Sequence, residues 1–230
     1  MEGFKWKNVN STDMNIITEK LPPKDVAMAR VEKVIISGRS GFLTLNDNSY
    51  DSIIKTVEFH FEKKGSINLD KLKAWLSGSS EVVFANDDDR YYKATIINQV
   101  NITEIIPTLS KVIVLFDCQP FGYLLNGSKT VTVSTNRTAI VNVGNYYSEP
   151  YMKLYGSGNI TLKVNCTSIL INNVDGYVEI DSELDTFYKG TESMENNVTG
   201  ECPHFEVGEN IIEWIGNVSK IEIIPRWRCL

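Results

Sequence analysis

The residues of this sequence that could do chemistry are two histidines and a few groups of carboxylates. His60 stands between Glu58 and Glu62 on the polar side of an expected strand, and His204 follows Pro203 in an expected loop. Neither histidine has a nucleophile or a metal ligand at a recognisable spacing, so both are expected to be ordinary surface side chains. We therefore expect no catalytic residue and no metal site.

Three other polar clusters are typical of turns or strand ends. Asn86–Asp89 offers oxygen ligands but lacks the D-x-D-x-D-G spacing and the distant glutamate of a calcium loop, so a polar turn is favoured. Gly156–Gly158 is flanked by β-rich sequence rather than by a phosphate-binding helix, which predicts a hairpin turn. Asp181, Glu183 and Asp185 could serve a glycoside hydrolase, but together they resemble a polar strand end. No cofactor is expected.

Composition and charge argue against several classes of protein. The 230 residues include 23 Lys+Arg and 29 Asp+Glu, which gives a net charge of −6. The sequence has no basic cluster of the kind that binds phosphates, so no specific nucleic-acid binding is expected. The longest apolar runs are four or five residues, whereas a membrane helix needs about 20, so no membrane insertion is expected. The N-terminus lacks the pattern of a secretory signal, and the four cysteines form no CxxC pair, which predicts reduced thiols.

The elements that position these residues are predominantly strands. Val57, Phe59 and Phe61 alternate with polar residues, which predicts a half-buried strand over Thr56–Glu62. Val112–Cys118 is apolar on both faces for most of its length and is expected to be central in a sheet. Further strands are expected at Val31–Ser37, Val82–Phe84, Tyr91–Ile106, Lys129–Ser134, Thr138–Val143, Tyr151–Tyr155, Asn159–Val164, Ser168–Ile171, Tyr177–Ile180 and Ile211–Ile224.

One segment, at about residues 68–77, predicts an α-helix. Asn68 is the expected N-cap, and Gly78 stands where a left-handed residue ends a helix. One apolar face is expected to be buried, formed by Leu69, Leu72, Trp75 and Leu76.

A turn-rich segment is expected to divide the chain. Phe121–Ser128 contains the dipeptide Asn126–Gly127, which is typical of a hinge between two β units. The domain boundary is therefore placed near residue 125, between a first domain of residues 1–125 and a second of residues 126–230. The length of the chain allows two such domains, each with its own core.

Short motifs follow one another in a distinctive order along nearly the whole chain. They are Gly3-Phe4-Lys5-Trp6 with Ser11-Thr12-Asp13-Met14, Val34–Tyr50, Trp75-Leu76-Ser77-Gly78 with Val83-Phe84 and Asn86–Tyr92, Phe116–Tyr123, Asn142-Val143-Gly144 with Glu149-Pro150 and Gly156-Ser157-Gly158, and Gly208-Glu209-Asn210 with Pro225-Arg226-Trp227. No single motif is specific, but the ordered set resembles the distal tail protein (Dit) family of long-tailed phages. The segment Cys202–Phe205 departs from the family pattern, and the length leaves little room for inserted carbohydrate-binding modules.

The resemblance implies a fold and a non-enzymatic structural role. The first domain would be a β-sandwich or split barrel with one helix, and the second a galectin-like β-sandwich whose last strand can return to the first domain. Family members form a homo-hexameric hub that joins the tail tube protein to the tail-associated tip protein and leaves a channel for DNA. The second domain would face outward and could support other baseplate proteins. The location would be the virion tail tip of a phage or phage-like particle, assembled in the cytoplasm of the bacterial host.

Two aromatic residues near the N-terminus are candidates for the subunit interface. Phe4 and Trp6 precede any complete core element, so their rings must dock somewhere. Burying two such rings could contribute about 3 to 6 kcal/mol. We therefore expect the N-terminal arm that carries them to lie at or near the contact between subunits.

Two alternatives to a structural hub remain open at this stage. Eight N-x-S/T sequons, beginning at Asn10, Asn101, Asn126, Asn136, Asn159, Asn165, Asn197 and Asn217, would fit an exported carbohydrate-binding β-sandwich. Asn, Ser and Thr are also the residues that turns and exposed strand faces require, so the sequons carry limited weight without a signal peptide. The third possibility is a glycan hydrolase that uses carboxylates such as Asp181 or Asp185.

Overall fold

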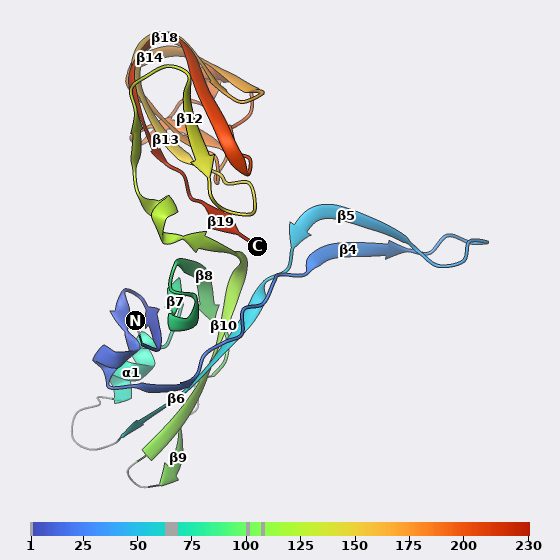
Figure 1. Ribbon diagram of the computed structural model, residues 1–230, viewed down its shortest axis with the longest axis vertical. Coiled ribbons are helices and arrows are strands. Elements are labelled where there is room, and N and C mark those ends of the chain that lie inside the picture. The colour runs from blue at the N-terminus through green and yellow to red at the C-terminus, as the bar shows by residue number, and fades with distance from the viewer. Residues whose placement is uncertain (1, 63–68, 100–101, 107–108) are drawn as a thin grey trace. The chain divides into compact units, whose positions relative to one another are not determined.

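The computed structural model describes residues 2–62, 69–99, 102–106 and 109–230 (Figure 1). The chain forms two compact units, one of Met1–Gly122 with Leu230 and one of Tyr123–Cys229. The regular structure is almost entirely β-strand, and the described residues contain a single α-helix. The expected mainly-β fold with one helix is confirmed.

The first unit is built around one antiparallel sheet in the order β2-β1-β7-β8-β10-β6-β3, with β9 also paired to β10. The short 3-10 turn η1 (Ser11–Met14) lies between β2 and β3 in the sequence, and η2 (Ala85–Asp87) connects the paired strands β7 and β8. A separate two-stranded sheet consists of β4 and β5. The strands are β1 (Phe4–Trp6), β2 (Val9–Asn10), β3 (Ile17–Lys20), β4 (Ala29–Val34), β5 (Leu43–Tyr50), β6 (Ile53–Glu62), β7 (Ser79–Phe84), β8 (Arg90–Ile96), β9 (Ile102–Ile106) and β10 (Leu109–Leu124).

The alternating residues of the central strands produce the core of the first unit. Val57, Phe59 and Phe61 on β6 are fully buried, as their spacing predicted. β10 lies between β6 and β8, which confirms the central position expected for Val112–Cys118. Only one face of β10 is buried, however, because Ile113 on the other face is 44% exposed.

The predicted helix forms α1 (Leu69–Trp75) and covers this core. Leu72, Trp75 and Leu76 are buried, whereas Leu69 is 38% exposed and does not belong to the buried face as expected. The expected N-cap Asn68 lies outside the described residues. Gly78 has φ +71°, so the left-handed residue expected after the helix is present.

The second unit contains one extended antiparallel sheet in the order β11-β18-β13-β14-β15-β16, with β12 paired to β18 and β17 paired to β14. Inward-facing side chains of the long strands share one apolar core. The 3-10 turns are η3 (Leu125–Ser128) and η4 (Glu195–Asn197). The strands are β11 (Val131–Val133), β12 (Thr138–Asn142), β13 (Tyr151–Val164), β14 (Thr167–Asp181), β15 (Thr186–Lys189), β16 (Glu192–Ser193), β17 (Val198–Thr199), β18 (Gly208–Ile224) and β19 (Arg228–Cys229).

The hairpin turn predicted at Gly156–Gly158 is wrong, because β13 continues through it as one strand. The pairing register with β14 shifts between Gly158 and Ile160, which is a β-bulge. A Cβ on Gly156 would stand 2.3 Å from the backbone oxygen of Asn217 on β18. The glycine therefore permits a close approach of two strands rather than a chain reversal.

The end of the chain is held by the end of β10, with which β19 pairs. The backbone N–H of Leu124 donates to the carbonyl of Trp227 (2.8 Å), and that of Arg226 donates to the carbonyl of Gly127 (2.9 Å). β19 belongs to the second unit, and Leu230 alone is grouped with the first.

Candidate functional site

Phe4 and Trp6, the predicted interface residues, lie in the core of the first unit. Both side chains are fully buried within the single chain. Phe4 stacks on Trp75 of α1 with ring centroids 5.5 Å apart, and Trp6 meets Phe116 edge-on at 5.2 Å. With no exposed surface, the rings could affect an interface only by holding β1 in place.

A reciprocal pair of hydrogen bonds fixes β1 to the helix. Trp6 Nε1–H donates to the backbone oxygen of Trp75 (2.8 Å), and Trp75 Nε1–H donates to the backbone oxygen of Trp6 (3.0 Å). Both indole donors are thereby satisfied inside the core, as buried polar groups require. The two tryptophans join strand and helix into one packed element.

The two histidines make surface contacts with carboxylates. His60 Nδ1 lies 3.1 Å from Glu19 Oε1, and His204 Nε2 lies 2.9 Å from Glu206 Oε1. Among the described residues, no group of three or more His, Cys, Asp or Glu side chains is arranged to hold a metal ion. In the same part of the chain, no helix is long and apolar enough to cross a membrane.

Two of the three carboxylates considered for hydrolysis, Asp181 and Glu183, instead hold the C-terminal segment. Arg226 Nη1 and Nη2 donate to the two carboxylate oxygens of Asp181 (2.6 and 3.1 Å), and Nη1 lies 3.5 Å from Glu183 Oε2. Burial alone would raise the pKa of Asp181, but the hydrogen bonds and charge of Arg226 hold it below its usual value. A general acid of a glycoside hydrolase needs the opposite shift. This geometry supports a structural clamp.

The outer face of the second unit's sheet carries tyrosines between lysines and glutamates. Lys153 Nζ lies 4.0 Å from the ring centroid of Tyr177, and Lys220 Nζ lies 4.5 Å from that of Tyr155. Tyr155 also donates a hydrogen bond to Glu222 (3.0 Å), which pairs with Lys220 (2.5 Å). A sugar stacking flat on either ring would have to compete with these ammonium groups.

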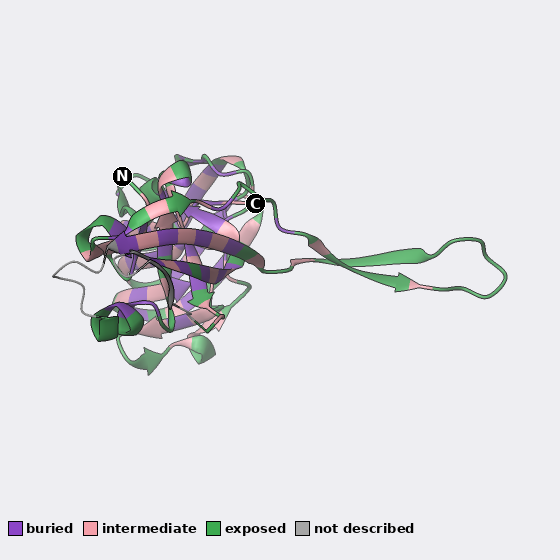
Figure 2. Cartoon of the chain, turned by 90° about the horizontal axis from the view of Figure 1, so that it is seen from below, coloured by how far each residue is buried: buried purple, intermediate pink, exposed green. Residues whose placement is uncertain are grey.

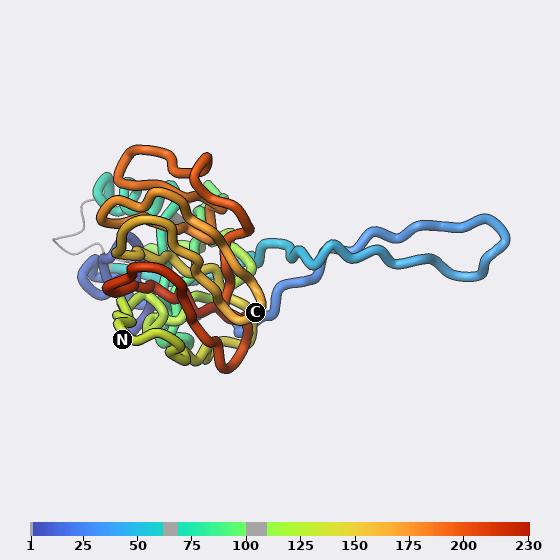
Figure 3. Tube along the Cα trace, turned by 90° about the horizontal axis from the view of Figure 1, so that it is seen from above, coloured from blue at the N-terminus to red at the C-terminus, as the bar shows by residue number. Residues whose placement is uncertain are grey.

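The feature that the sequence did not predict is a projecting β-hairpin, which we call the arm (residues 29–50). It consists of β4, β5 and the connecting tip (residues 35–42), and it extends away from the rest of the first unit (Figures 2 and 3). The sequence predicts a strand at Val31–Ser37 but gives no sign of its exposure. Ile35 is 84% exposed, and the other exposed large apolar residues of the arm are Val31, Ile36, Phe42, Leu43 and Leu45.

The arm presents two different faces. Paired residues of an antiparallel hairpin point to the same side. One side carries the pairs Glu32–Leu45 and Val34–Leu43, and the other carries Val31–Asn46 and Lys33–Thr44. Lys33 Nζ lies 4.7 Å from the ring centroid of Phe42. A two-stranded hairpin without a third layer is marginally stable in water, so these exposed apolar groups indicate a missing contact.

The segment that leads into the arm is anchored to the first unit. Asn86 Nδ2 donates to the carbonyl of Pro22 (2.7 Å), and the buried Lys55 Nζ donates to that of Pro23 (3.3 Å). Lys24 pairs with the carboxylate of Asp87 (3.2 Å) in η2. These contacts hold the chain just before β4.

The return strand is anchored at the same end of the arm. The backbone N–H of Asp51 donates to the carbonyl of Met28 (2.9 Å), and Arg30 Nε lies 3.0 Å from Asp51 Oδ1. Tyr50 packs edge-on against Phe121 with ring centroids 5.8 Å apart. The base of the arm is therefore built on specific contacts, while its tip is exposed.

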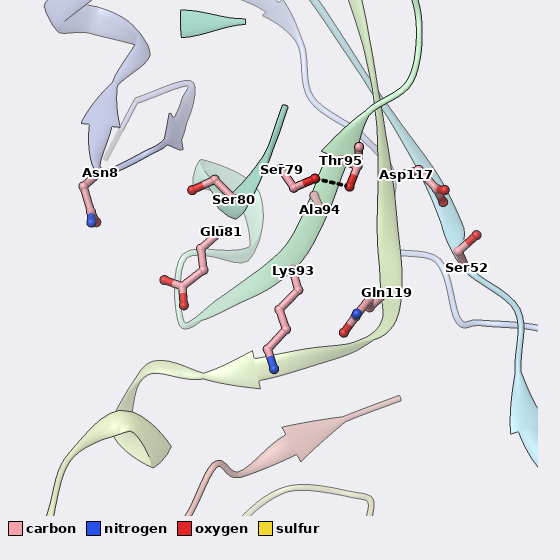
Figure 4. Close-up of a pocket in the computed structure, with 10 residues that line it drawn as sticks. All are labelled: Asn8, Ser52, Ser79, Ser80, Glu81, Lys93, Ala94, Thr95, Asp117 and Gln119. Atoms are coloured by element: carbon pink, nitrogen blue, oxygen red, sulfur yellow. Dashed lines mark hydrogen bonds between the residues drawn. The ribbon is translucent and has the colours of Figure 1, made fainter. Parts of the chain in front are cut away.

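A groove on the first unit is the second surface feature. It has a volume of about 780 Å³ and runs along β7, β8 and β10 (Figure 4). Glu81 and Asp117 line it together with Lys93, and a hydrogen bond joins Ser79 Oγ to Thr95 Oγ1 (2.8 Å). Asp117 Oδ1 is buried and accepts no hydrogen bond from the described residues.

Comparison with known proteins supports the fold. No family model and no curated protein sequence matches the chain. The crystal structure of the SPP1 Dit protein, described as a paradigm of the hub adsorption apparatus in Gram-positive infecting phages, is similar with a TM-score of 0.76 and 12% sequence identity. The similarity covers 96% of this chain and 97% of that chain. The chain therefore has a Dit-like fold over both of its units.

Proposed function

We propose that this protein is a structural component of a phage tail tip, a hub that joins the tail tube to the tip proteins. The observation that carries the proposal is the likeness to SPP1 Dit over nearly the full length of both chains. The ordered motifs of the sequence support the same assignment independently of the fold. In this proposal the protein acts by assembly rather than by catalysis.

The hub would be a ring of six copies, assembled through the first unit. A closed ring needs heterologous contacts, in which each copy offers one patch and receives another. The first unit supplies an element suited to this task, because the arm exposes apolar residues such as Ile35 and Phe42 on a well-anchored base. β1, held by Phe4 and Trp6, would keep its place beside the interface without exposing those rings.

The ring would surround a channel for DNA. The net charge of −6 supports this role, because attraction between the wall and many phosphates would slow passage. The second unit would have a galectin-like topology and face outward, where it could support further baseplate proteins. The expected partners are the tail tube protein and the tail-associated tip protein, within a virion assembled in the host cytoplasm.

Mass measurement and microscopy test the hub directly. The purified chain is expected to form rings of about six copies in negative-stain images, with a matching mass by light scattering. A ring that also binds a tail tube protein of the same particle would support the joining role. A chain that stays monomeric at every concentration, alone and with that tube protein, would overturn the proposal.

A further inference from the structure

We propose that β12 is a docking edge, at which a strand of a partner protein joins the sheet of the second unit. The partner segment is an extended stretch in which Lys or Arg alternates with apolar residues. We call the docking surface the β12 edge, which is the side of β12 away from β18 together with Val143. The inference goes beyond the proposed hub, because it concerns the second unit alone and does not depend on a ring.

The open hydrogen-bonding groups at this side of the sheet belong to β12. β11 pairs with residues 221–223 of β18, and β12 pairs with residues 208–212. Between them Asn136 takes the place of a strand, because its side chain accepts from the Trp214 N–H (2.9 Å) and donates to the Trp214 carbonyl (2.8 Å). In the described part of the chain β12 pairs with β18 alone. Alternate residues of β12 therefore present N–H and C=O groups to its unpaired side.

The β12 edge lacks the features that usually prevent edge pairing. Native edge strands are kept short, or they carry charged residues or proline. The opposite edge of the same sheet follows this rule, because β16 has only two residues, both exposed, and one of them is Glu192. Residues 138–148 contain neither a charged residue nor a proline. β12 is therefore available for strand addition, in which backbone hydrogen bonds supply the affinity.

The solvent face beside this edge is apolar. Val141 and Val143 are each 56% exposed and lie on the same face of the chain, on which Ala139 is also exposed. The register of β12 with β18 brings Val207, which is 54% exposed, next to Val143. Exposed apolar side chains that gather on one face indicate a contact with another molecule.

The charges around the β12 edge indicate the chemistry of the partner. Glu209 is exposed and is the register partner of Val141, and among the described residues it takes part in no ion pair. Glu213 on the same strand is, in contrast, paired with basic side chains. Residues 201–210 contain three glutamates and no Lys or Arg. A basic partner is therefore favoured over a second copy of this chain, whose own edge is acidic.

The two faces of an added strand would meet different surroundings. Its residues opposite Val141 and Val143 share their solvent face. A Lys or Arg there can lay its alkyl stem on the valine and place its charge beside Glu209, on a strand about 9.6 Å away at two strand spacings. Its residues opposite Ile140 and Asn142 share the buried face, where an apolar side chain extends the core. This alternation defines the partner segment.

Peptide binding to the purified full chain tests the β12 edge. The probe is a short capped peptide that alternates lysine with valine, labelled for fluorescence anisotropy, and the control peptide carries glutamate in place of lysine. The lysine peptide is expected to bind at least about tenfold more tightly, because like charges at an edge repel. Equal binding of the two peptides, or binding of neither at millimolar concentration, would overturn the proposal.

A charge reversal on β18 assigns the binding to this edge. Glu209→Lys is expected to weaken binding of the lysine peptide about tenfold and to strengthen binding of the glutamate peptide. Glu192→Lys makes the same charge change at the opposite edge of the sheet and should leave both affinities unchanged. Both residues are exposed, so unchanged thermal unfolding will show that the variants fold. Equal effects of the two variants would contradict docking at β12.

Methylation of the peptide backbone distinguishes strand addition from side-chain contact alone. In a strand pair, alternate residues direct their N–H groups toward the neighbouring strand and the others direct them away from it. N-methylation of one alternate set of residues should therefore abolish binding, whereas methylation of the other set should have little effect. An equal response to the two sets would reject strand addition.

Hydrogen exchange identifies which molecule occupies the edge. Addition of the lysine peptide is expected to slow the exchange of backbone amides in β12. Protection of the same amides that rises with the concentration of the chain alone, without peptide, would show that a second copy occupies the edge. That result would overturn the choice of a basic partner.

Discussion

The arm and the β13–β14 hairpin are both long antiparallel hairpins, yet one is exposed and the other forms a core. Along β13, Met152, Leu154, Ile160 and Leu162 are buried, because β18 pairs with the other edge of the strand and the sheet encloses them. The arm has a similar apolar content, but β4 and β5 pair only with each other. A third strand, rather than strand propensity, thus decides whether a hairpin becomes part of a core or stays exposed.

Truncation of an apolar residue should change the free energy of unfolding very differently in the two hairpins, and this is the largest effect that we expect. Leu162→Ala is expected to lower the free energy of unfolding by about 2 to 5 kcal/mol, because it opens a cavity in a closed core. Leu45→Ala in the arm should change it by less than about 0.5 kcal/mol in the dilute, unassembled chain. Urea unfolding measures both, and equal losses would show that the arm packs within its own chain.

Removal of the Asp181 clamp should cause the next largest loss of stability. The free energy of unfolding is expected to fall by about 1.5 to 3 kcal/mol, the usual contribution of hydrogen bonds to a charged group. The pKa of Asp181 is held below its usual value when folded, so its stabilisation is complete above about pH 4 and is lost as the pH falls through the folded pKa. The difference between the natural chain and Asp181→Asn should therefore shrink in acid. Thermal unfolding from pH 7 to pH 3 tests this.

Asp51→Asn at the base of the arm is the control for this pH dependence. Asp51 and Arg30 are both exposed, so their pair should contribute little at any pH. A loss in Asp181→Asn that stays constant down to pH 3 would mean that the clamp acts by shape rather than by charge.

Even one added carbon atom at the bulge of β13 should destabilise the fold. Gly156→Ala is expected to lower the free energy of unfolding by about 1 to 3 kcal/mol, because the new Cβ meets the backbone of β18, which cannot move aside easily. Ser37→Ala at the arm tip is the control and should be neutral. Chemical unfolding measures both variants. Equal free energies of unfolding for the two would mean that β13 and β18 can move apart here at little cost.

The smallest effect is expected for the ion pair at the base of the arm. Arg30→Ala should lower the free energy of unfolding by about 0.2 to 1 kcal/mol, and less in high salt, because both partners are exposed. Unfolding at low and high salt measures this term. A loss that is larger and insensitive to salt would show that Arg30 holds the arm by packing.

Local patterns predicted much of the fold. The alternation in β6 located buried Val57, Phe59 and Phe61, and the apolar run of β10 located a central strand. The turn predicted from the glycines near Gly156 was wrong, because Gly156 allows β13 and β18 to approach closely. Tyr91–Ile106, expected as one β-rich run, forms the separate strands β8 and β9.

The candidate site could not be predicted in the same way. Phe4 and Trp6 attracted attention because they are large and precede the core, yet the helix and β10 close over them. The arm contains ordinary strand residues, and exposure of Ile35 is not encoded in any local spacing. The available signal was indirect: glycines on both sides of Arg39 separate two β-rich runs.

The sequence by itself determined the strand periodicity, the single helix, the net charge and the absence of a recognisable catalytic motif, because these depend on residues close together in the chain. Only the tertiary structure decided which strands find a third partner. Pairings such as β13 with β18 join residues far apart in sequence, and their free energy depends on the whole sheet. For that reason the core of the second unit could be expected in outline, while the exposed arm became visible only in three dimensions.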